Sequence, residues 1–215
     1  SIGAVYDKHF DRANRLISET DALGHVTQYE YDAAGNRTKA TNANGYSTTY
    51  VYDAINRLTS QTDPLGHVTA YEYDELGNRT AVIDANGNRK TTTFDANSRK
   101  TSDTSIMGAV TRYEYDALGN LTATVDAKGN RVAYVYDADE RLVSQTDALG
   151  NVTAYEYDAV DNRIGMVDAN GHASSYEYDA ANRLTSQTDA LGQTTSFGYD
   201  GVGNRTSMLD ANGHT

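Results

Sequence analysis

Aspartate is the residue whose spacing most strongly suggests chemistry in this sequence. It recurs every 21 residues, ten times without an insertion, at Asp11, Asp32, Asp53, Asp74, Asp95, Asp116, Asp137, Asp158, Asp179 and Asp200. Calcium needs about six to eight oxygens converging on one point, and one aspartate per repeat supplies too few. A hydrogen bond from each carboxylate to its own turn backbone explains the residue type locally. We therefore predict no metal site.

Histidine is the second candidate for chemistry. Four of the five histidines directly follow a glycine, and they are His25, His67, His172 and His214, with His9 elsewhere. Other repeats place Ala109 or Asn88 in the same slot. A general base or metal ligand would not be interchangeable with alanine, so we expect solvated turn side chains. No Ser, His and Asp combination departs from the repeat, and the sequence predicts no catalytic residue, no cofactor and no enzyme activity.

Composition excludes several function classes. The chain has no cysteine, which excludes disulfides and thiolate metal sites. Its net charge of −12 opposes binding to phosphate backbones, so nucleic acid is a poor partner. No apolar run approaches about 18 residues, so we expect no membrane insertion. The N-terminus lacks the basic and apolar regions of a signal peptide, and no export signal is visible in this fragment.

The aspartates belong to a repeat with two further fixed positions. The residue before each aspartate is always tyrosine or phenylalanine, and a glycine always follows 13 residues later. A glycine that never varies indicates a positive φ angle. We predict that these positions define the structural repeat, namely Tyr31, Asp32, Tyr52, Asp53, Tyr73, Asp74, Tyr115, Asp116, Tyr136, Asp137, Tyr157, Asp158, Tyr178 and Asp179, with Gly45, Gly66, Gly87, Gly129, Gly150, Gly171 and Gly192.

The segments between the turns read as short strands. Residues 57–62 and 67–73 are rich in Thr, Val and Tyr and alternate in character, as strands do. Tyr71 and Tyr73 are two residues apart, so their rings share one face of the sheet while Ala70 and Glu72 take the other. Each 21-residue unit is therefore a β-hairpin, and the hairpins should pair into one long, twisted antiparallel sheet. The fold class is all-β, and residues 1–215 form a single continuous array of about ten repeats without a separate domain.

Tyrosine should provide most of the apolar area. The chain has 17 tyrosines and no tryptophan. Equivalent rings of neighbouring hairpins should form ladders that are the core of the sheet, with each ring contact contributing roughly 0.5–1.5 kcal/mol. A lone hairpin is marginal in water, so stability should grow with repeat number. Stacking of sugars or bases on these rings is the less favoured alternative.

Two kinds of repeat alternate, which makes a 42-residue double repeat. Arginine follows the aspartate by four residues in one kind, as in Arg57, and by five in the other, as in Arg79. Such an offset changes the face of the side chain unless a bulge or a longer turn absorbs it. The second turn alternates between an apolar tip (Leu23, Leu65, Met107, Leu149, Leu191) and a polar one. We expect the apolar tips to pack against another layer or another copy of the chain.

The recurring strings Tyr-Asp, Gly-Asn-Arg-Thr, Asn-Arg-Leu-Thr-Ser and Asp-Ala-Leu-Gly closely resemble the RHS or YD repeat family. The resemblance covers residues 6–215. It implies a broad β-sheet that spirals into a hollow shell around the toxic part of bacterial toxins, or a place in large bacterial cell-surface proteins. The family's self-cleaving core segment contains an Asp-Pro signature. Here Asp63-Pro64 occupies an ordinary turn slot, so Pro64 is expected to stiffen that turn.

The resemblance leaves two functions open. The first is a non-catalytic wall segment of a toxin-encapsulating shell, with an encapsulated toxin domain as a partner. The second is a self-assembling extracellular or cell-surface fibre or adhesin, whose exposed edge strands pair with other copies or further repeats. Either role implies a secreted or cell-surface protein. About twenty strands at ~4.8 Å spacing give a ribbon roughly 95 Å long, so a shell needs many more repeats than this chain contains.

Overall fold

The computed structural model describes residues 5–214. Residues 1–4 and 215, which include the N-terminal positions that bear on a signal peptide, lie outside the described residues. The chain forms twenty strands that belong to one sheet. The odd-numbered strands are β1 (Val5–Phe10), β3 (Val26–Tyr31), β5 (Ser47–Tyr52), β7 (Val68–Tyr73), β9 (Arg89–Phe94), β11 (Val110–Tyr115), β13 (Arg131–Tyr136), β15 (Val152–Tyr157), β17 (Ala173–Tyr178) and β19 (Thr194–Tyr199). The even-numbered strands are β2 (Leu16–Asp21), β4 (Arg37–Thr41), β6 (Leu58–Thr62), β8 (Arg79–Ile83), β10 (Lys100–Thr104), β12 (Leu121–Val125), β14 (Leu142–Thr146), β16 (Arg163–Val167), β18 (Leu184–Thr188) and β20 (Arg205–Leu209).

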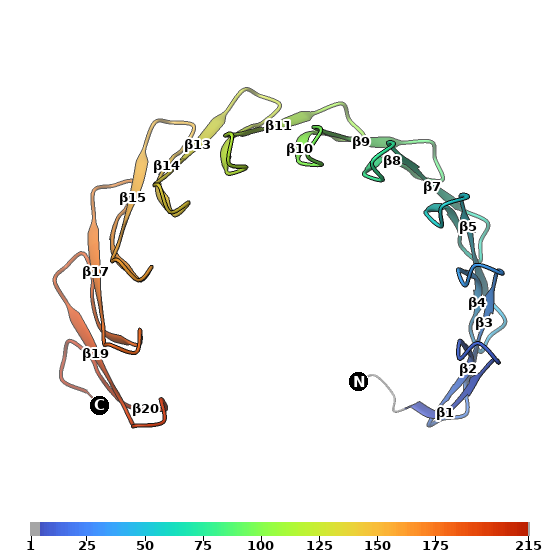
Figure 1. Ribbon diagram of the computed structural model, residues 1–215, viewed down its shortest axis with the longest axis horizontal. Coiled ribbons are helices and arrows are strands. Elements are labelled where there is room, and N and C mark those ends of the chain that lie inside the picture. Colours follow the sequence, from blue (N-terminus) through green and yellow to red (C-terminus); the bar gives the residue numbers. More distant parts are fainter. Residues whose placement is uncertain (1–4, 215) are drawn as a thin grey trace. The chain divides into compact units, whose positions relative to one another are not determined.

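The strands pair antiparallel in chain order. The chain divides into two compact units, Ser1–Val110 and Thr111–Thr215. In the first unit, each strand from β1 to β10 pairs with the next, as β6 does with β7 and β7 with β8. In the second unit, β11 to β20 follow the same scheme. Figure 1 shows the strands following one another in this order within each unit. The predicted all-β array of antiparallel hairpins is confirmed.

Every repeat contains two turns of the same geometry. The proximal turn follows an odd strand and the distal turn follows an even one. In the proximal turn at Asp53, the Asp53 amide donates to the Arg57 carbonyl (2.9 Å) and the Asn56 amide donates to the Asp53 carbonyl (3.0 Å). The distal turn at Asp63 repeats both bonds with His67 and Gly66, each at 3.0 Å. This pattern is a hairpin loop of three residues that follow the aspartate. The last of the three, which is the fourth residue of the turn counted from the aspartate, adopts a left-handed conformation.

A β-bulge accompanies each proximal turn. Val51 pairs with Ser60 but Tyr52 pairs with Leu58, so the register skips one residue. The same skip occurs in the other kind of repeat, where Glu72 pairs with Ala81 and Tyr73 with Arg79. Because the bulge is identical in both kinds, it does not absorb the one-residue offset between their arginines. Those arginines occupy consecutive positions and contact different tyrosine rings, as described below.

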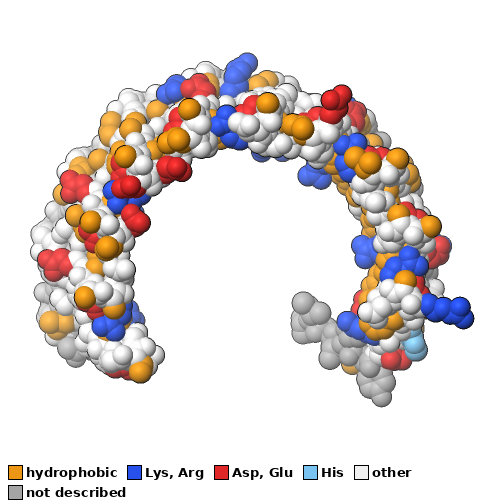
Figure 2. Space-filling view, viewed as in Figure 1, with side chains coloured by type: hydrophobic (Ala, Val, Ile, Leu, Met, Phe, Trp, Pro, Cys, Tyr) orange, Lys and Arg blue, Asp and Glu red, His pale blue; other side chains and the backbone are white. Residues whose placement is uncertain are grey.

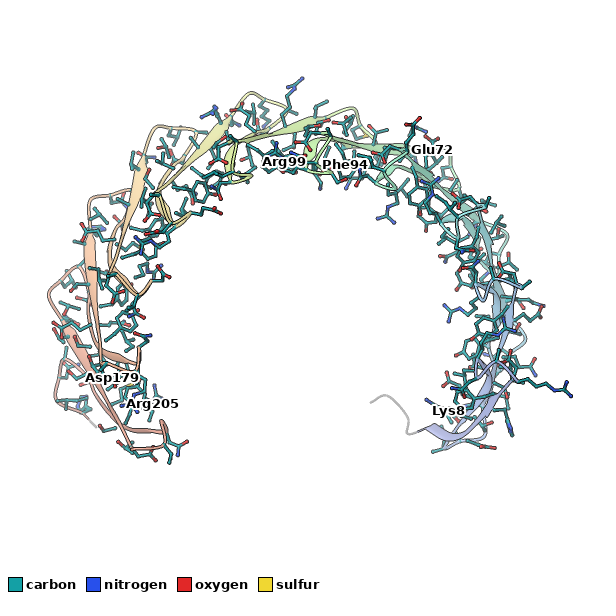
Figure 3. All side chains as sticks on the ribbon, viewed as in Figure 1. Lys8, Glu72, Phe94, Arg99, Asp179 and Arg205 are labelled. Atoms are coloured by element: carbon teal, nitrogen blue, oxygen red, sulfur yellow. The ribbon has the colours of Figure 1, made fainter. Side chains whose placement is uncertain are left out.

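The sheet has two faces of different character. The tyrosine face carries Tyr71, Tyr73 and the opposing Val82, and the glutamate face carries Glu72 and the opposing Ala81. Figure 3 labels Phe94 and Glu72, which belong to the tyrosine face and the glutamate face, respectively. Along β3 and β17 the tyrosines are partly buried and the glutamates exposed. The expectation that rings two residues apart share one face therefore agrees with the strand register.

The sheet encloses almost no conventional core. Among the described residues, only two hydrophobic side chains are buried, Ala81 at 2% exposure and Ala123 at 0%. The tyrosines are only partly buried, because a single sheet layer leaves one side of each ring open. Figure 2 shows hydrophobic, acidic and basic side chains interspersed over the surface in view. Stability must come from contacts along the sheet between neighbouring hairpins.

The apolar tips of the distal turns have no cover in this chain. Leu23 is 82% exposed and Leu149 is 87% exposed, and the equivalent residues of the other double repeats are similarly solvated. The expectation that they pack against another layer of the chain is wrong, because no second layer lies over the turns in the described residues. Packing against a second copy stays a prediction.

The left-handed turn position predicts opposite effects for two matched substitutions. Gly66 has φ +85° with nothing within 4 Å of an added Cβ, whereas Glu140 occupies the fourth position of its turn at φ +62°. Gly66→Ala should lower the free energy of unfolding by roughly 1–2 kcal/mol, because an L-residue disfavours this conformation. Glu140→Gly should raise it by up to about 1 kcal/mol, because glycine adopts a positive φ without a steric penalty. Urea unfolding measures both, and effects of the same sign would contradict this assignment.

Candidate functional site

The repeated aspartates organise the proximal turns. Asp53 Oδ1 accepts hydrogen bonds from the backbone amides of Ile55 (3.0 Å) and Arg57 (2.9 Å), and Oδ2 accepts one from Arg57 Nε (2.7 Å). Asp74 is held in the same way by the amide and the side-chain amide of Asn78. The bonds from Arg57 lower the pKa of Asp53, and the side-chain bond from Asn78 lowers the pKa of Asp74.

The histidines have a structural part in the distal turns. Asp63 Oδ1 accepts the amides of Leu65 (2.8 Å) and His67 (2.9 Å), and Oδ2 lies 2.9 Å from His67 Nδ1. His67 is 61% exposed, so it is solvated as expected, yet it also contacts the turn carboxylate. In other turns Asn88 Nδ2 makes the same bond to Asp84. Histidine and asparagine therefore interchange because each can donate to the second carboxylate oxygen.

The turn carboxylates do not converge into a metal site. Across residues 5–214, no group of three or more His, Cys, Asp or Glu side chains is arranged to hold a metal ion. Each turn aspartate instead directs its oxygens to donors of its own turn, as at Asp53 and Asp63. In the same part of the chain, no helix is long and apolar enough to cross a membrane.

The first kind of arginine, present in alternate hairpins, links its hairpin to the next one. Besides its bond to Asp53, Arg57 donates from Nη1 to the carbonyl of Asp74 at 2.9 Å. Its guanidinium carbon lies 4.8 Å from the centre of the Tyr73 ring, within the range of a cation–π contact. One side chain thus joins two successive proximal turns. The same three contacts recur at Arg15, Arg141 and Arg183.

The tyrosines before the aspartates also link neighbouring hairpins. The Tyr73 hydroxyl donates to the carbonyl of Leu58, 15 residues earlier, at 2.8 Å. This bond connects the end of β7 with the start of β6, the strand that precedes it in the chain and pairs with it in the sheet. Equivalent bonds are made by Tyr31, Tyr52, Tyr136, Tyr157, Tyr178 and Tyr199.

The second kind of arginine lies between tyrosine rings. The Arg37 guanidinium carbon is 5.5 Å from the Tyr29 ring centre and 5.3 Å from that of Tyr50. Arg163 lies between Tyr155 and Tyr176 in the same way. Arginine therefore takes part in the predicted tyrosine ladder, which interleaves guanidinium groups with rings at these positions. Cation–π contacts contribute about 0.5–1 kcal/mol each at exposed sites, and more when desolvated.

Among the described residues, the pKa is raised for three tyrosines of this face, which are Tyr29, Tyr52 and Tyr136. Burial and a 2.6 Å hydrogen bond from its hydroxyl to Glu19 Oε1 raise the pKa of Tyr29 to about 12. The phenol therefore stays neutral at physiological pH and donates to the carboxylate. Tyr29 thus acts as a fixed donor within the sheet.

The predicted repeat residues occupy equivalent places throughout the described chain. The tyrosines end the odd strands, the aspartates open the proximal turns and the glycines take the left-handed position of the distal turns. The sequence pattern missed a second left-handed position, in the proximal turn. It holds glycine in some repeats, but Asn14, Asn56, Ser98, Glu140, Asp161 and Asn182 in others. Asparagine, which tolerates this conformation, was the available signal.

The tyrosine hydroxyl can be tested with a matched pair. Tyr73→Phe removes the bond to the Leu58 carbonyl, so we expect a loss of about 0.5–1.5 kcal/mol in the free energy of unfolding. The Tyr71 ring faces Arg79, but its hydroxyl forms no hydrogen bond within residues 5–214. Tyr71→Phe should therefore be nearly neutral. Equal losses in the two variants, measured by chemical denaturation, would show that the hydroxyl bond contributes nothing specific.

The 42-residue periodicity of these contacts coincides with matches to a known family. The sequence profile of the RHS repeat matches residues 10–48, 52–89, 94–131, 136–173 and 178–215. The chain belongs to the RHS repeat family. Successive matches begin 42 residues apart, so each corresponds to one double repeat of the RHS chain. A search of curated proteins found no match.

Solved structures with a similar trace include parts of much larger toxin proteins. The crystal structure of TcdB2-TccC3 without its hypervariable C-terminal region matches at 15% identity and TM-score 0.49, covering 94% of this chain. The Tc holotoxin pore of Photorhabdus luminescens matches at 15% identity and TM-score 0.43, covering 98%. This RHS chain spans only 15% of the length of either. A porin-like protein from Bacteroides uniformis matches at 12% identity and TM-score 0.27, covering 94% of this chain and 86% of its own.

Proposed function

We propose that this RHS repeat chain is a non-catalytic wall segment of a larger shell. The observation that carries the proposal is that the same links between hairpins recur along the chain. Arg57 and Tyr73 join one hairpin to the next through backbone carbonyls, and their equivalents do so along both units. Because each link uses only neighbouring repeats, the same sheet can be extended by further repeats without a new kind of contact.

The chemistry of the repeat supports a structural role. The carboxylates that recur most regularly accept hydrogen bonds from their own turns, as at Asp53 and Asp74. The arginines are engaged with those carboxylates and with tyrosine rings. Side chains used in this way stabilise the sheet rather than present a reactive group to solvent. The proposal accordingly assigns no catalytic residue, metal or cofactor to the segment.

The partner and location follow from the proposed shell. A shell built from RHS repeats would enclose a cargo, and we assign that place to a toxin domain of the longer protein. The bacterial exterior or cell surface is the corresponding location. Ten hairpins at ~4.8 Å per strand give a ribbon roughly 95 Å long, which is too short to surround a folded domain, so the shell requires additional repeats.

The repetition of the same hairpin along both units supports a second candidate, a fibre or adhesin. In the described residues β1 pairs only with β2, and β20 only with β19. Unpaired strand edges are templates for further pairing, either with flanking repeats or with other copies. A fibre needs only that such pairing continue in one direction.

Electron microscopy of the native, full-length protein that contains this segment distinguishes the two. Closed hollow particles of uniform size are expected for a shell, and internal density would then mark the cargo. Long filaments whose axial repeat corresponds to one or two hairpins would overturn the shell and establish the fibre. Extended particles without closure or association would contradict both.

A further inference from the structure

Four glutamates recur at equal intervals on the glutamate face, and one of them has no ion-pair partner in the described residues. Glu30, Glu72, Glu114 and Glu156 recur at 42-residue intervals, on β3, β7, β11 and β15. Each of the first three forms an ion pair with a basic side chain, which is Lys39 for Glu30 (3.1 Å), Arg89 for Glu72, and Arg131 for Glu114 (2.7 Å). Within residues 5–214, the structure gives Glu156 neither a hydrogen bond nor an ion pair.

The ion pair of Glu72 shows how this face of the sheet accommodates an arginine side chain. Glu72 on β7 lies opposite Ala81 on β8, and Arg89 belongs to the strand beyond, β9. Both terminal nitrogens of the Arg89 guanidinium donate to the Glu72 carboxylate, including a 2.6 Å hydrogen bond from Nη2 to Oε2. The ion pair therefore spans the small alanine of the middle strand. This explains why Ala81, like Ala123 in the next double repeat, is almost completely buried.

The fourth double repeat keeps the carboxylate and lacks its cation. Glu156 lies opposite Gly165 on β16, and Ala173 stands at the position that Arg89 and Arg131 occupy. The missing side chains leave a pocket of about 270 Å³ beside Glu156 and Gly165. Glu156 folds toward the glycine, where its Oε2 would lie 3.0 Å from an added Cβ. The pocket thus lies where a guanidinium group lies in the two preceding double repeats, and it keeps the carboxylate that would bind one.

The walls of the pocket suit an arginine side chain. Ala154, Val167 and Ala173, which lie on the same face as Glu156, provide apolar contact for its methylene groups, and Asp189 also lines the pocket. Asp189 Oδ1 accepts the amides of Leu191 and Gln193, and no side chain of the described residues donates to its Oδ2. The pocket is therefore acidic and able to accept planar donors, as arginine provides.

We propose that the pocket at Glu156 binds an arginine side chain of another polypeptide, which takes the place that Arg89 and Arg131 fill elsewhere in this chain. The net charge of −12 favours approach of a basic partner. The inference goes beyond the proposed wall function and does not depend on it. Its support is internal, because two equivalent glutamates of the same sheet already hold a guanidinium.

The test is an NMR titration of the full chain with N-acetyl-arginine-N-methylamide, observing the Glu156 side-chain carboxyl and the Gly165 amide. Saturable shifts at both positions are expected. The neutral isostere N-acetyl-citrulline-N-methylamide is the matched probe and should produce no saturable shift. Equal responses to the two probes, or shifts spread evenly over all glutamates, would overturn the proposal.

Three variants separate binding at this pocket from weak surface attraction. Glu156→Gln, at an exposed position, should retain the fold and lose the saturable shifts. Ala173→Arg should occupy the pocket from within and also abolish binding. Arg89→Ala should create a second site, with new saturable shifts at Glu72. Retained binding in Glu156→Gln or Ala173→Arg would refute the site, and no gain in a folded Arg89→Ala variant would refute the equivalence on which it rests.

Discussion

Lowering the pH below about 4 should unfold this chain cooperatively. Turn aspartates throughout both units have a pKa below the ordinary value of 3.8, as Asp53, Asp84 and Asp168 illustrate. The backbone bond from Arg57, the side-chain bond from Asn88 and the backbone bond from His172, respectively, are the largest lowering causes. A depressed folded pKa contributes stability that is fully present above the unfolded value. That stability is lost as the pH falls through the folded pKa.

The effect should be large because it is repeated. Protonation removes an acceptor from each turn that an aspartate opens, over the same narrow pH range. Neighbouring hairpins stabilise one another, so the losses combine. Far-UV circular dichroism during acid titration measures the transition. A midpoint near pH 6 would implicate histidine rather than aspartate and would contradict this mechanism.

A turn of this chain that lacks aspartate suggests the control for acid unfolding. Asn42 replaces aspartate in one distal turn, and its Oδ1 still accepts the amides of Asn44 and Tyr46. Asparagine therefore maintains the turn without a titratable group. Replacing Asp84, Asp126 and Asp168 together by Asn should move the acid midpoint to lower pH and leave the fold at pH 7 unchanged. An unchanged midpoint would show that the turn carboxylates do not control acid stability.

Arg57→Ala should be among the most destabilising single substitutions in the array. It removes the bond to Asp53 Oδ2, the bond to the Asp74 carbonyl and the contact with the Tyr73 ring. Charge-assisted hydrogen bonds and a cation–π contact together suggest a loss of about 2–4 kcal/mol in the free energy of unfolding. The loss exceeds that of an ordinary surface ion pair because Arg57 bridges two hairpins.

Two further variants show whether the bridge or the charge matters. Arg57→Lys keeps the charge but lacks the planar group that reaches three partners, so it should recover less than half of the loss. Arg112 is exposed on β11 and has no hydrogen bond or ion pair in the described residues, so Arg112→Ala should be nearly neutral. Urea unfolding measures all three. Equal effects of Arg57→Ala and Arg112→Ala would refute the bridging role.

Periodicity alone predicted the architecture. The 21-residue spacing of Asp and Gly located the turns, and the two-residue spacing of Tyr71 and Tyr73 predicted their common face. These features are local, because turn geometry and strand alternation depend on residues close in the chain. The alternation of two kinds of repeat was also visible, and the family matches follow the same 42-residue period.

The partners of individual side chains were decided by the tertiary structure. Arg57 reaches Asp74 and Glu72 reaches Arg89 over 17 residues of sequence, and the second contact crosses β8. Such contacts depend on register, twist and side-chain direction, which a periodic pattern does not specify. For the same reason, the solvation of Leu149 and the gap beside Glu156 became evident only once neighbouring strands were in place. The sequence by itself determined which turns and strands form, whereas the assembled sheet determined which charges meet.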